Sequence, residues 1–224
     1  LFYTNPAMSP FCIQFEVLHF ILQSVGYKSI GYEHWSGYNN TSKLDMGLIR
    51  LTNPNQYITS RFYTDANGGG INGQLKQYLT VGEQGIKVGL VIKKSGNTTG
   101  ITSSTVTKTG TWATYGDQVN GVSLLAIESE LVSGTGKLIP RQFYITPYEA
   151  VAGSGDSGST VYRASDNALI GVQSGIKGIG NEWEDKSYSK TMWSSPAWYA
   201  NNLLGAIYQY TSTSDIPVSR MQGQ

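Results

Sequence analysis

The sequence predicts an all-β protein, a barrel or a sandwich, with one helix near its C-terminal end. Most segments are short β-type runs separated by clusters of Gly, Ser, Asn and Thr, a pattern typical of strands joined by turns. Charged residues make up only 14% of the 224 residues, well below the usual quarter. The helix is predicted in "SPAWYANNLLGAIYQY", where Ser195 would cap the first turn and Pro196 occupies the first helical position.

The predicted strands are the following runs: "YKSIGYEHW" (27–35), "LDMGLIRL" (44–51), "IKVGLVIKK" (86–94), "ITSSTVTKTG" (101–110), "VNGVSLLAIES" (119–129), "LIPRQFYIT" (138–146) and "NALIGVQSG" (167–175). The third and fourth runs are joined by "SGNTTG", which predicts a hairpin. We expect loops at 65–74 and 111–138, and a boundary between two halves of the chain at 83–85. No internal repeat is present.

Composition and charge exclude several classes of function. The net charge is +1 with no basic stripe, so nucleic acid and anionic membrane surfaces are not expected partners. No run of 18 apolar residues is present to span a membrane. Cys12 is the only cysteine, which rules out an intrachain disulfide and a multi-cysteine metal site. The polar, weakly charged composition predicts a secreted protein, and we expect a monomer without metal or organic cofactor.

The stretch "AGSGDSGSTVY" (152–162) contains the best candidate nucleophile, Ser157. Gly155 and Gly158 allow backbone angles that a side chain would forbid. Successive N–H groups then point into one concavity, which would hold the oxyanion of an acyl-transfer intermediate. The structural alternative is a glycine-rich hairpin without catalytic function.

A serine hydroxyl needs a base, and that base needs an orienting partner. The chain has two histidines, His19 and His34. Asp45 lies within the apolar run "KLDMGLIRL", where a charge is costly to bury unless it is paired. Asp45 is therefore the candidate that orients the histidine. The alternative is an aspartate in a strand-entry turn, satisfied by backbone amides.

Four motifs occur in one order along the chain: "DMGLIRL", "VGLVIKKSGNTTGITSSTVT" (88–107), "GDSGST" (155–160) and "NALIGVQSG". With these motifs the chain resembles the chymotrypsin-like (trypsin-fold) serine proteases, and is closest to their bacterial, streptogrisin-like branch. The resemblance implies two antiparallel six-stranded β-barrels with a C-terminal helix. Residues 1–85 would form the barrel that carries the histidine and the aspartate. Residues 86–224 would form the barrel with the serine and the specificity pocket, plus the helix.

The resemblance also implies roles for individual residues. Ser157 matches the nucleophile, Asp45 the orienting carboxylate, and the N–H groups of Gly155 and Ser157 the oxyanion hole. His19 is favoured as the base because it lies 26 residues before Asp45 (45 − 19), close to the compact bacterial pattern. His34 lies only 11 residues before Asp45 and is the alternative base.

The resemblance further implies an ion pair and a substrate site. Asp156 matches a buried aspartate whose usual bacterial partner is an internal arginine, for which Arg141 is the candidate. The substrate-binding residues implied are Val151 at the pocket base, its polar neighbour Gln173, and Ser174, Gly175 and Ile176 along the substrate strand. A pocket base without an acidic residue does not favour Lys or Arg substrates.

Two functions follow from the sequence. The first is a secreted serine endopeptidase that hydrolyses peptide bonds through a His-Asp-Ser triad and an acyl-enzyme intermediate. The second is a protease homologue that has lost catalysis and acts as a secreted binding protein. The 15 tyrosines and five tryptophans would suit such recognition.

Overall fold

The computed structural model of the chain describes residues 2–3, 31–39, 41–51, 57–58, 61–62, 73–76, 78–115, 121–139, 148–177, 188–204 and 216–217. The strands are β1 (Phe2–Tyr3), β2 (Gly31–Ser36), β3 (Gly47–Leu51), β4 (Tyr57–Ile58), β5 (Arg61–Phe62), β6 (Gly73–Gln74), β7 (Val91–Ser95), β8 (Ile101–Tyr115), β9 (Val122–Leu131), β10 (Lys137–Ile139), β11 (Tyr148–Ala150), β12 (Ala152–Gly153), β13 (Thr160–Arg163), β14 (Leu169–Ile176), β15 (Tyr188–Ser189), β16 (Thr191–Pro196) and β17 (Ile216–Pro217). One helix, α2 (Ala197–Leu204), is present among the described residues. The predicted all-β class with a C-terminal helix is confirmed.

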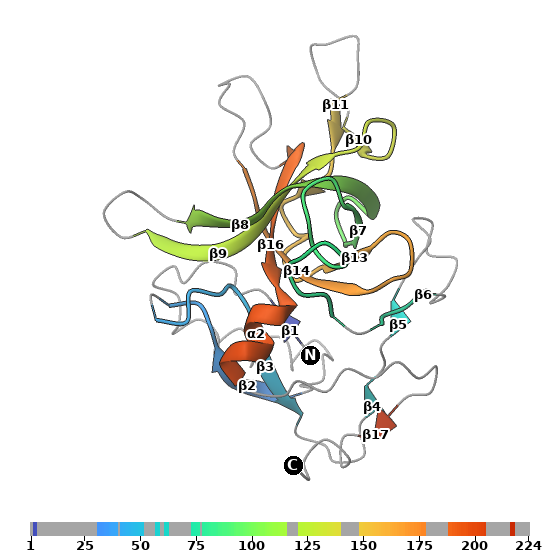
Figure 1. Cartoon of the computed structure of the whole chain (residues 1–224). Helices are drawn as coiled ribbons and strands as arrows, with labels where there is room; N and C mark the ends of the chain where they lie inside the picture. The colour runs from blue at the N-terminus through green and yellow to red at the C-terminus, as the bar shows by residue number, and fades with distance from the viewer. Residues whose placement is uncertain are drawn as a thin grey trace, which may run out of the picture.

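Six strands close into an antiparallel barrel in the order β13-β14-β16-β9-β8-β7 (Figure 1). Strand β7 pairs with β8 on one side and with β13 on the other, so the sheet has no free edge. The predicted hairpin is confirmed, because β7 and β8 pair from Val91↔Thr105 to Ser95↔Ile101.

The loop predicted at 111–138 is largely strand. Strand β8 runs to Tyr115, β9 occupies Val122–Leu131, and β10 begins at Lys137. The polar composition of this region comes from strands with one face in solvent: Trp112 is 57% exposed and the next residue, Ala113, is 0% exposed. The region contains few apolar residues, so the alternation typical of a strand is weak there and a loop was predicted.

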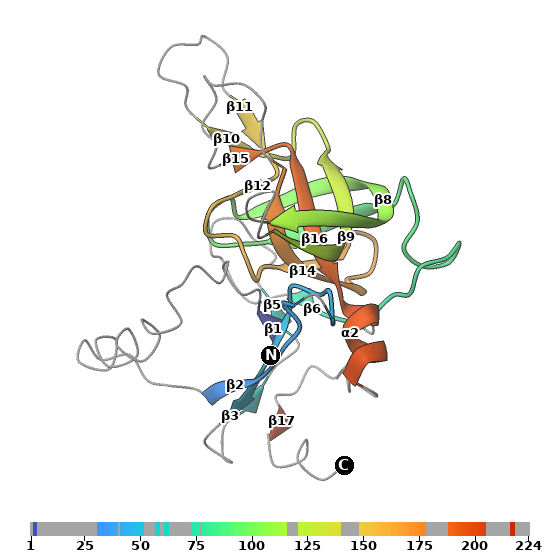
Figure 2. The ribbon, with the colours of Figure 1, turned by 90° about the vertical axis from the view of Figure 1, so that its left-hand side faces the viewer.

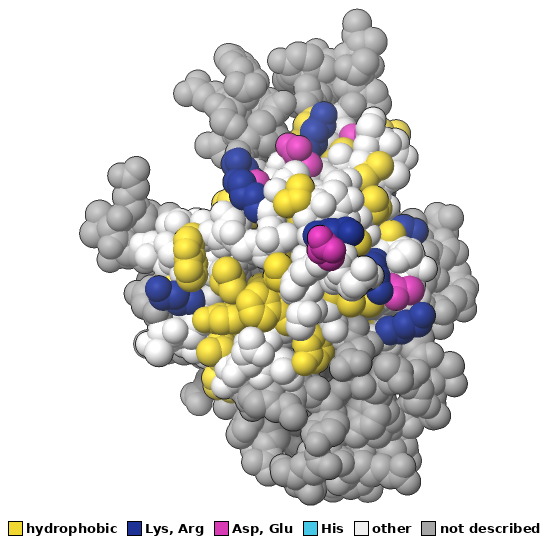
Figure 3. Space-filling view, in the orientation of Figure 1, with side chains coloured by type: hydrophobic (Ala, Val, Ile, Leu, Met, Phe, Trp, Pro, Cys, Tyr) yellow, Lys and Arg dark blue, Asp and Glu magenta, His cyan; other side chains and the backbone are white. Residues whose placement is uncertain are grey.

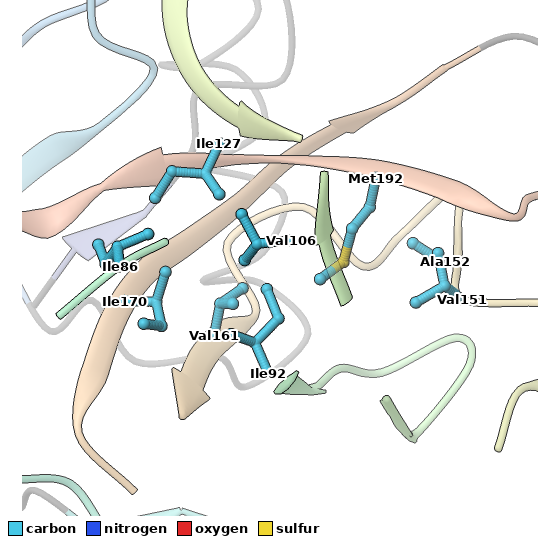
Figure 4. Packing of buried hydrophobic residues seen from close by; sticks show 9 residues of the cluster. All are labelled: Ile86, Ile92, Val106, Ile127, Val151, Ala152, Val161, Ile170 and Met192. Atoms are coloured by element: carbon cyan, nitrogen blue, oxygen red, sulfur yellow. The ribbon is translucent and has the colours of Figure 1, made fainter. Parts of the chain in front are cut away.

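The barrel interior is filled by a cluster of aliphatic side chains and one methionine (Figure 4). Its members are Ile86, Ile92, Val106, Ile127, Val151, Ala152, Val161, Ile170 and Met192, each at most 1% exposed. They come from most of the barrel strands and from the segments that precede β7 and β13. Burial of these side chains is the main term that stabilises the barrel.

The N-terminal strands form smaller sheets. Strands β1, β3 and β2 form a three-stranded sheet, while β5 pairs with β6 and β4 with β17. Figure 2 shows β2 and β3 below the barrel, on the side where α2 leaves β16. The barrel predicted for residues 1–85 is not complete within the described residues and stays a prediction.

A second core cluster joins the N-terminal part to the barrel. It contains Leu44 and Met46, which precede β3, together with Val172 of β14 and Ala200 of α2. Leu44 and Met46 are buried against β14. This packing places the residue between them, Asp45, next to the barrel.

The helix begins at Ala197, one residue after the predicted first helical position: Pro196 is the last residue of β16, and Ser195 does not cap the helix. Ser195 belongs to β16, where it pairs with Val172. Strand pairing therefore continues up to the residue before the helix begins.

Acidic and basic side chains are interspersed on the face shown in Figure 3, while hydrophobic side chains gather near β9 and α2. Exposed large hydrophobic residues include Trp112 on β8 and Leu203 on α2. Within the described residues, no helix has the length and hydropathy needed to cross a membrane.

Candidate active site

Ser157 lies in a tight turn between β12 and β13. Gly155 and Gly158 have φ angles of +96° and +86°, which L side chains rarely adopt. The turn is closed by hydrogen bonds from the Asp156 N–H to the Gly153 carbonyl (3.1 Å) and from the Gly158 N–H to the Gln173 carbonyl (2.8 Å). This backbone presents the Ser157 side chain at the surface.

The N–H groups on either side of Asp156 are the candidate oxyanion donors. Among the described residues, the N–H groups of Gly155 and Ser157 donate to no other group, whereas those of Asp156 and Gly158 are bonded. Both Gly155 and Ser157 are exposed. Two exposed donors beside a hydroxyl form an arrangement that can bind an oxyanion.

Asp45 and Ser157, 112 residues apart in the chain (157 − 45), both contact Ser174 of β14. The Ser174 hydroxyl donates to Oδ2 of Asp45 over 2.6 Å. The Ser157 hydroxyl donates to the Ser174 carbonyl over 3.4 Å. The fold therefore brings the candidate carboxylate and the candidate nucleophile to the two sides of one residue.

Asp45 is 2% exposed and lies just before β3, at the strand entry. This position agrees with the alternative interpretation, an aspartate in a strand-entry turn satisfied by backbone amides. However, the partners of Asp45 include a side-chain hydroxyl, that of Ser174. Burial, and then the negative charge of Asp45, raise the pKa of the Tyr38 phenol. Asp45 is thus a buried carboxylate whose partners include a hydroxyl group.

Only one of the two candidate bases lies among the described residues. His34 lies in β2 at a bulge, since Glu33 pairs with Ile49 and Trp35 with Leu48. His19 lies outside the described residues. The choice of His19 over His34 as the base stays a prediction.

Asp156 forms a buried ion pair with Lys94 of β7. The Lys94 ammonium lies 3.2 Å from Oδ2 of Asp156, and both side chains are 0% exposed. The same ammonium donates to the Thr99 hydroxyl (2.7 Å) and the Gly100 carbonyl (3.2 Å). The ion pair connects the turn that carries Ser157 to the β7–β8 connection.

Asp156 is held by four further donors. Oδ1 accepts from the N–H groups of Thr98 (2.8 Å) and Thr99 (3.2 Å); Oδ2 accepts from the Thr99 hydroxyl (2.7 Å) and the Gly153 N–H (2.9 Å). Burial alone would raise the pKa of Asp156, but the Lys94 charge and these hydrogen bonds lower it. Burial lowers the pKa of Lys94, while the charge of Asp156 and its hydrogen bond with Lys94 act to raise it. The Lys94 charge and the hydrogen bonds thus favour the ionised form of Asp156.

The partner of Asp156 was missed by sequence reasoning, which proposed Arg141. Arg141 lies outside the described residues, and the structure places Lys94 against the carboxylate. Two adjacent lysines at the end of a hairpin strand are expected in solvent. The available signal was the alternation of β7, which buries Ile92 and Lys94 and leaves Lys93 between them only half-buried.

Of the predicted substrate-binding residues, Gln173, Ser174, Gly175 and Ile176 lie on β14, and Val151 lies between β11 and β12. Val151 is fully buried and packs in the barrel core next to Ala152 and Met192 (Figure 4). Gln173 is 1% exposed; its amide donates to the Gly175 carbonyl over 3.1 Å, and its Oε1 has no partner among the described residues. Gly175 and Ile176 are half-buried on β14. Their roles in substrate binding stay predictions.

Any hydrolysis that depends on the turn around Ser157 is expected to fall at a pH below the ordinary lysine value of 10.5, because burial lowers the pKa of Lys94. Above that lowered pKa, Asp156 loses its counter-charge and the turn loses its anchor. By linkage, the unfolded chain binds more protons than the folded chain between the lowered pKa and 10.5, so Lys94 alone makes unfolding harder as pH rises there. The predicted loss of activity is therefore not unfolding.

The measurement is kcat/KM and the free energy of unfolding between pH 7 and 10.5. Lys94→Arg keeps its charge throughout this range and is expected to move the fall of kcat/KM to higher pH. Lys93→Arg, at the neighbouring half-buried position, is the control and should leave the profile unchanged. A profile that Lys94→Arg does not move would contradict the prediction.

Comparison with known proteins identifies the fold. No protein-family model and no curated protein matches the sequence. Among solved structures, the chain is similar to a glutamic acid-specific serine protease that uses a histidine triad in substrate binding (20% identity, 81% of this chain, 74% of that chain, TM-score 0.51). It is also similar to the chymotrypsin of Cellulomonas bogoriensis (19% identity, 81% of this chain, 76% of that chain, TM-score 0.48). The first of these likenesses, together with the closed barrel, shows that the chain has the chymotrypsin-like fold of bacterial serine proteases.

Proposed function

We propose that the protein is a secreted serine endopeptidase with Ser157 as its nucleophile. The observation that carries the proposal is the placement of Ser174, which accepts from the Ser157 hydroxyl and donates to the buried Asp45 carboxylate. The two unbonded N–H groups of Gly155 and Ser157 lie in the same turn as the hydroxyl. Nucleophile, carboxylate and oxyanion donors are the parts that acyl transfer requires.

In the proposed reaction, the Ser157 oxygen attacks the substrate carbonyl while the imidazole of His19 takes the hydroxyl proton. The carbonyl oxygen becomes an oxyanion that accepts from the Gly155 and Ser157 N–H groups. Asp45 holds the imidazole tautomer and stabilises its positive charge. The proton then passes to the leaving amine, the C–N bond breaks, and water hydrolyses the acyl-enzyme by the reverse proton route.

The substrate is proposed to be a peptide or protein, bound by a monomer without a cofactor. Ser174, Gly175 and Ile176 would pair with the substrate backbone along β14. Val151 and Gln173 carry no charge, so a preference for Lys or Arg at the scissile bond is not expected. In this proposal residues 1–85 contribute the base and Asp45, and residues 86–224 the nucleophile and the pocket.

Labelling with a fluorophosphonate tests the proposal. The folded protein is expected to form a covalent adduct that mass spectrometry maps to Ser157. Ser157→Ala should lose the adduct, while Ser154→Ala, an exposed serine three residues away, should keep it. His19→Ala should abolish labelling and His34→Ala should not; the opposite pattern would make His34 the base. Absence of labelling and of peptide hydrolysis in the parent protein would support the binding-protein alternative.

A further inference from the structure

Thr98, in the β7–β8 connection, contacts the residues on both sides of Gly155. Its hydroxyl donates to the Ser154 carbonyl over 2.7 Å. Its backbone N–H donates to Oδ1 of Asp156 over 2.8 Å. A Cβ placed on Gly155 would lie 2.5 Å from the Thr98 hydroxyl oxygen, so the two segments approach as closely as a glycine allows.

The bond between the Thr98 hydroxyl and the Ser154 carbonyl determines where the Gly155 N–H points. The Ser154 carbonyl and the Gly155 N–H belong to one peptide unit, which is planar and trans. In such a unit the C=O and N–H bonds point in opposite directions. A carbonyl held toward Thr98 therefore turns the Gly155 N–H away from Thr98, where it meets no acceptor among the described residues.

We propose that Thr98 is a positioning residue that holds the Gly155 N–H in the orientation needed to bind the oxyanion. The inference deepens the proposed peptidase function and rests on it for its kinetic consequences. Without the Thr98 hydroxyl, the Ser154–Gly155 peptide is free to rotate, since glycine tolerates both orientations. The rotated peptide would present a carbonyl oxygen to the site and repel the oxyanion.

Thr98 differs in this respect from its neighbour Thr99. The Thr99 hydroxyl is buried and bonds to Lys94, Asp156 and the Val151 carbonyl, so it supports the ion pair and the core. Among the described residues, the Thr98 hydroxyl donates only to the Ser154 carbonyl, and Thr98 is half-buried. Its loss exposes no charge, so the effect on catalysis is separable from an effect on folding.

Thr98→Val removes the hydroxyl at constant shape, and Thr98→Ser retains it. We expect Thr98→Val to lower kcat at least tenfold with little change in KM, up to the roughly 10²–10³-fold loss seen when an oxyanion donor is removed. The affinity for a peptidyl aldehyde, whose adduct carries an oxyanion, should fall by a similar factor. Thr98→Ser should restore both. Thr135→Val is the matched control, because the Thr135 hydroxyl also donates to a backbone carbonyl, that of Val132 (2.6 Å), in the connection between β9 and β10.

A second readout does not depend on activity. The ¹⁵N and ¹H shifts of the Gly155 amide should change in Thr98→Val and not in Thr98→Ser or Thr135→Val. If the parent hydrolyses peptides and Thr98→Val keeps its kcat, aldehyde affinity and Gly155 shifts, the inference is wrong. If the parent does not hydrolyse peptides but the Gly155 shifts follow the expected pattern, the peptidase proposal fails while the anchoring of the peptide stands.

Discussion

Replacing Asp45 by asparagine is expected to lower kcat by about 10⁴-fold, the loss that accompanies the wrong histidine tautomer in a Ser-His-Asp site. Asparagine keeps the size of the side chain but removes its charge. The Ser174 hydroxyl, which donates to Oδ2, can still be satisfied by the amide oxygen. In the proposed triad, the amide nitrogen would then face the imidazole and impose the tautomer that cannot accept the Ser157 proton.

The measurement is kcat and KM on a peptide substrate, with unfolding monitored in parallel. Asp166→Asn is the control, because Asp166 is an ion-paired carboxylate (2.7 Å to Arg163) in the turn between β13 and β14. Ser174→Ala should cost far less than Asp45→Asn, since it removes one hydrogen bond and leaves the charge. Equal activity of Asp45→Asn and the parent would exclude Asp45 from the catalytic machinery.

Replacing Lys94 by methionine is expected to lower the free energy of unfolding by about 3–5 kcal/mol, the typical cost of leaving one partner of a buried ion pair alone. Methionine fills a similar volume, so the change isolates the lost charge and donors. Asp156 would keep its four other hydrogen bonds but would have no counter-charge within the barrel wall. Activity should fall as well, because Asp156 lies between Gly155 and Ser157, whose N–H groups are the proposed oxyanion donors.

Chemical denaturation with fluorescence detection gives the change in stability. Lys93→Met, at the adjacent half-buried position, should stay within about 0.5 kcal/mol of the parent. The double variant Lys94→Met/Asp156→Leu should recover much of the stability, because replacing both charges by apolar groups of similar size is often neutral. It should not recover activity. A small loss of stability in Lys94→Met alone would show that the pair contributes little.

Several features of the fold follow from sequence pattern alone. The β7–β8 hairpin, β14 and α2 were predicted because each combines a local periodicity with a strong signal at one of its ends. Examples are "SGNTTG" in the hairpin and Pro196 before the helix. Strands were predicted at 101–110 and 119–129, but the end of β8 and the start of β10 were taken for a loop. Closure of the barrel could not be predicted from any segment, since the pairing of β7 with β13 joins residues about 70 positions apart.

The sequence by itself determined the turn that carries Ser157. Gly155 and Gly158 permit the positive φ angles that bend the chain around Ser157, and this is a local property of glycine. Only the tertiary structure decided the partners of that turn: Lys94 for Asp156, Thr98 for the Ser154 carbonyl, and Ser174 between Ser157 and Asp45. These contacts depend on the closure of the barrel and on the packing of Leu44 and Met46 against β14, because charge and hydrogen-bond partners are chosen by distance in space and not along the chain.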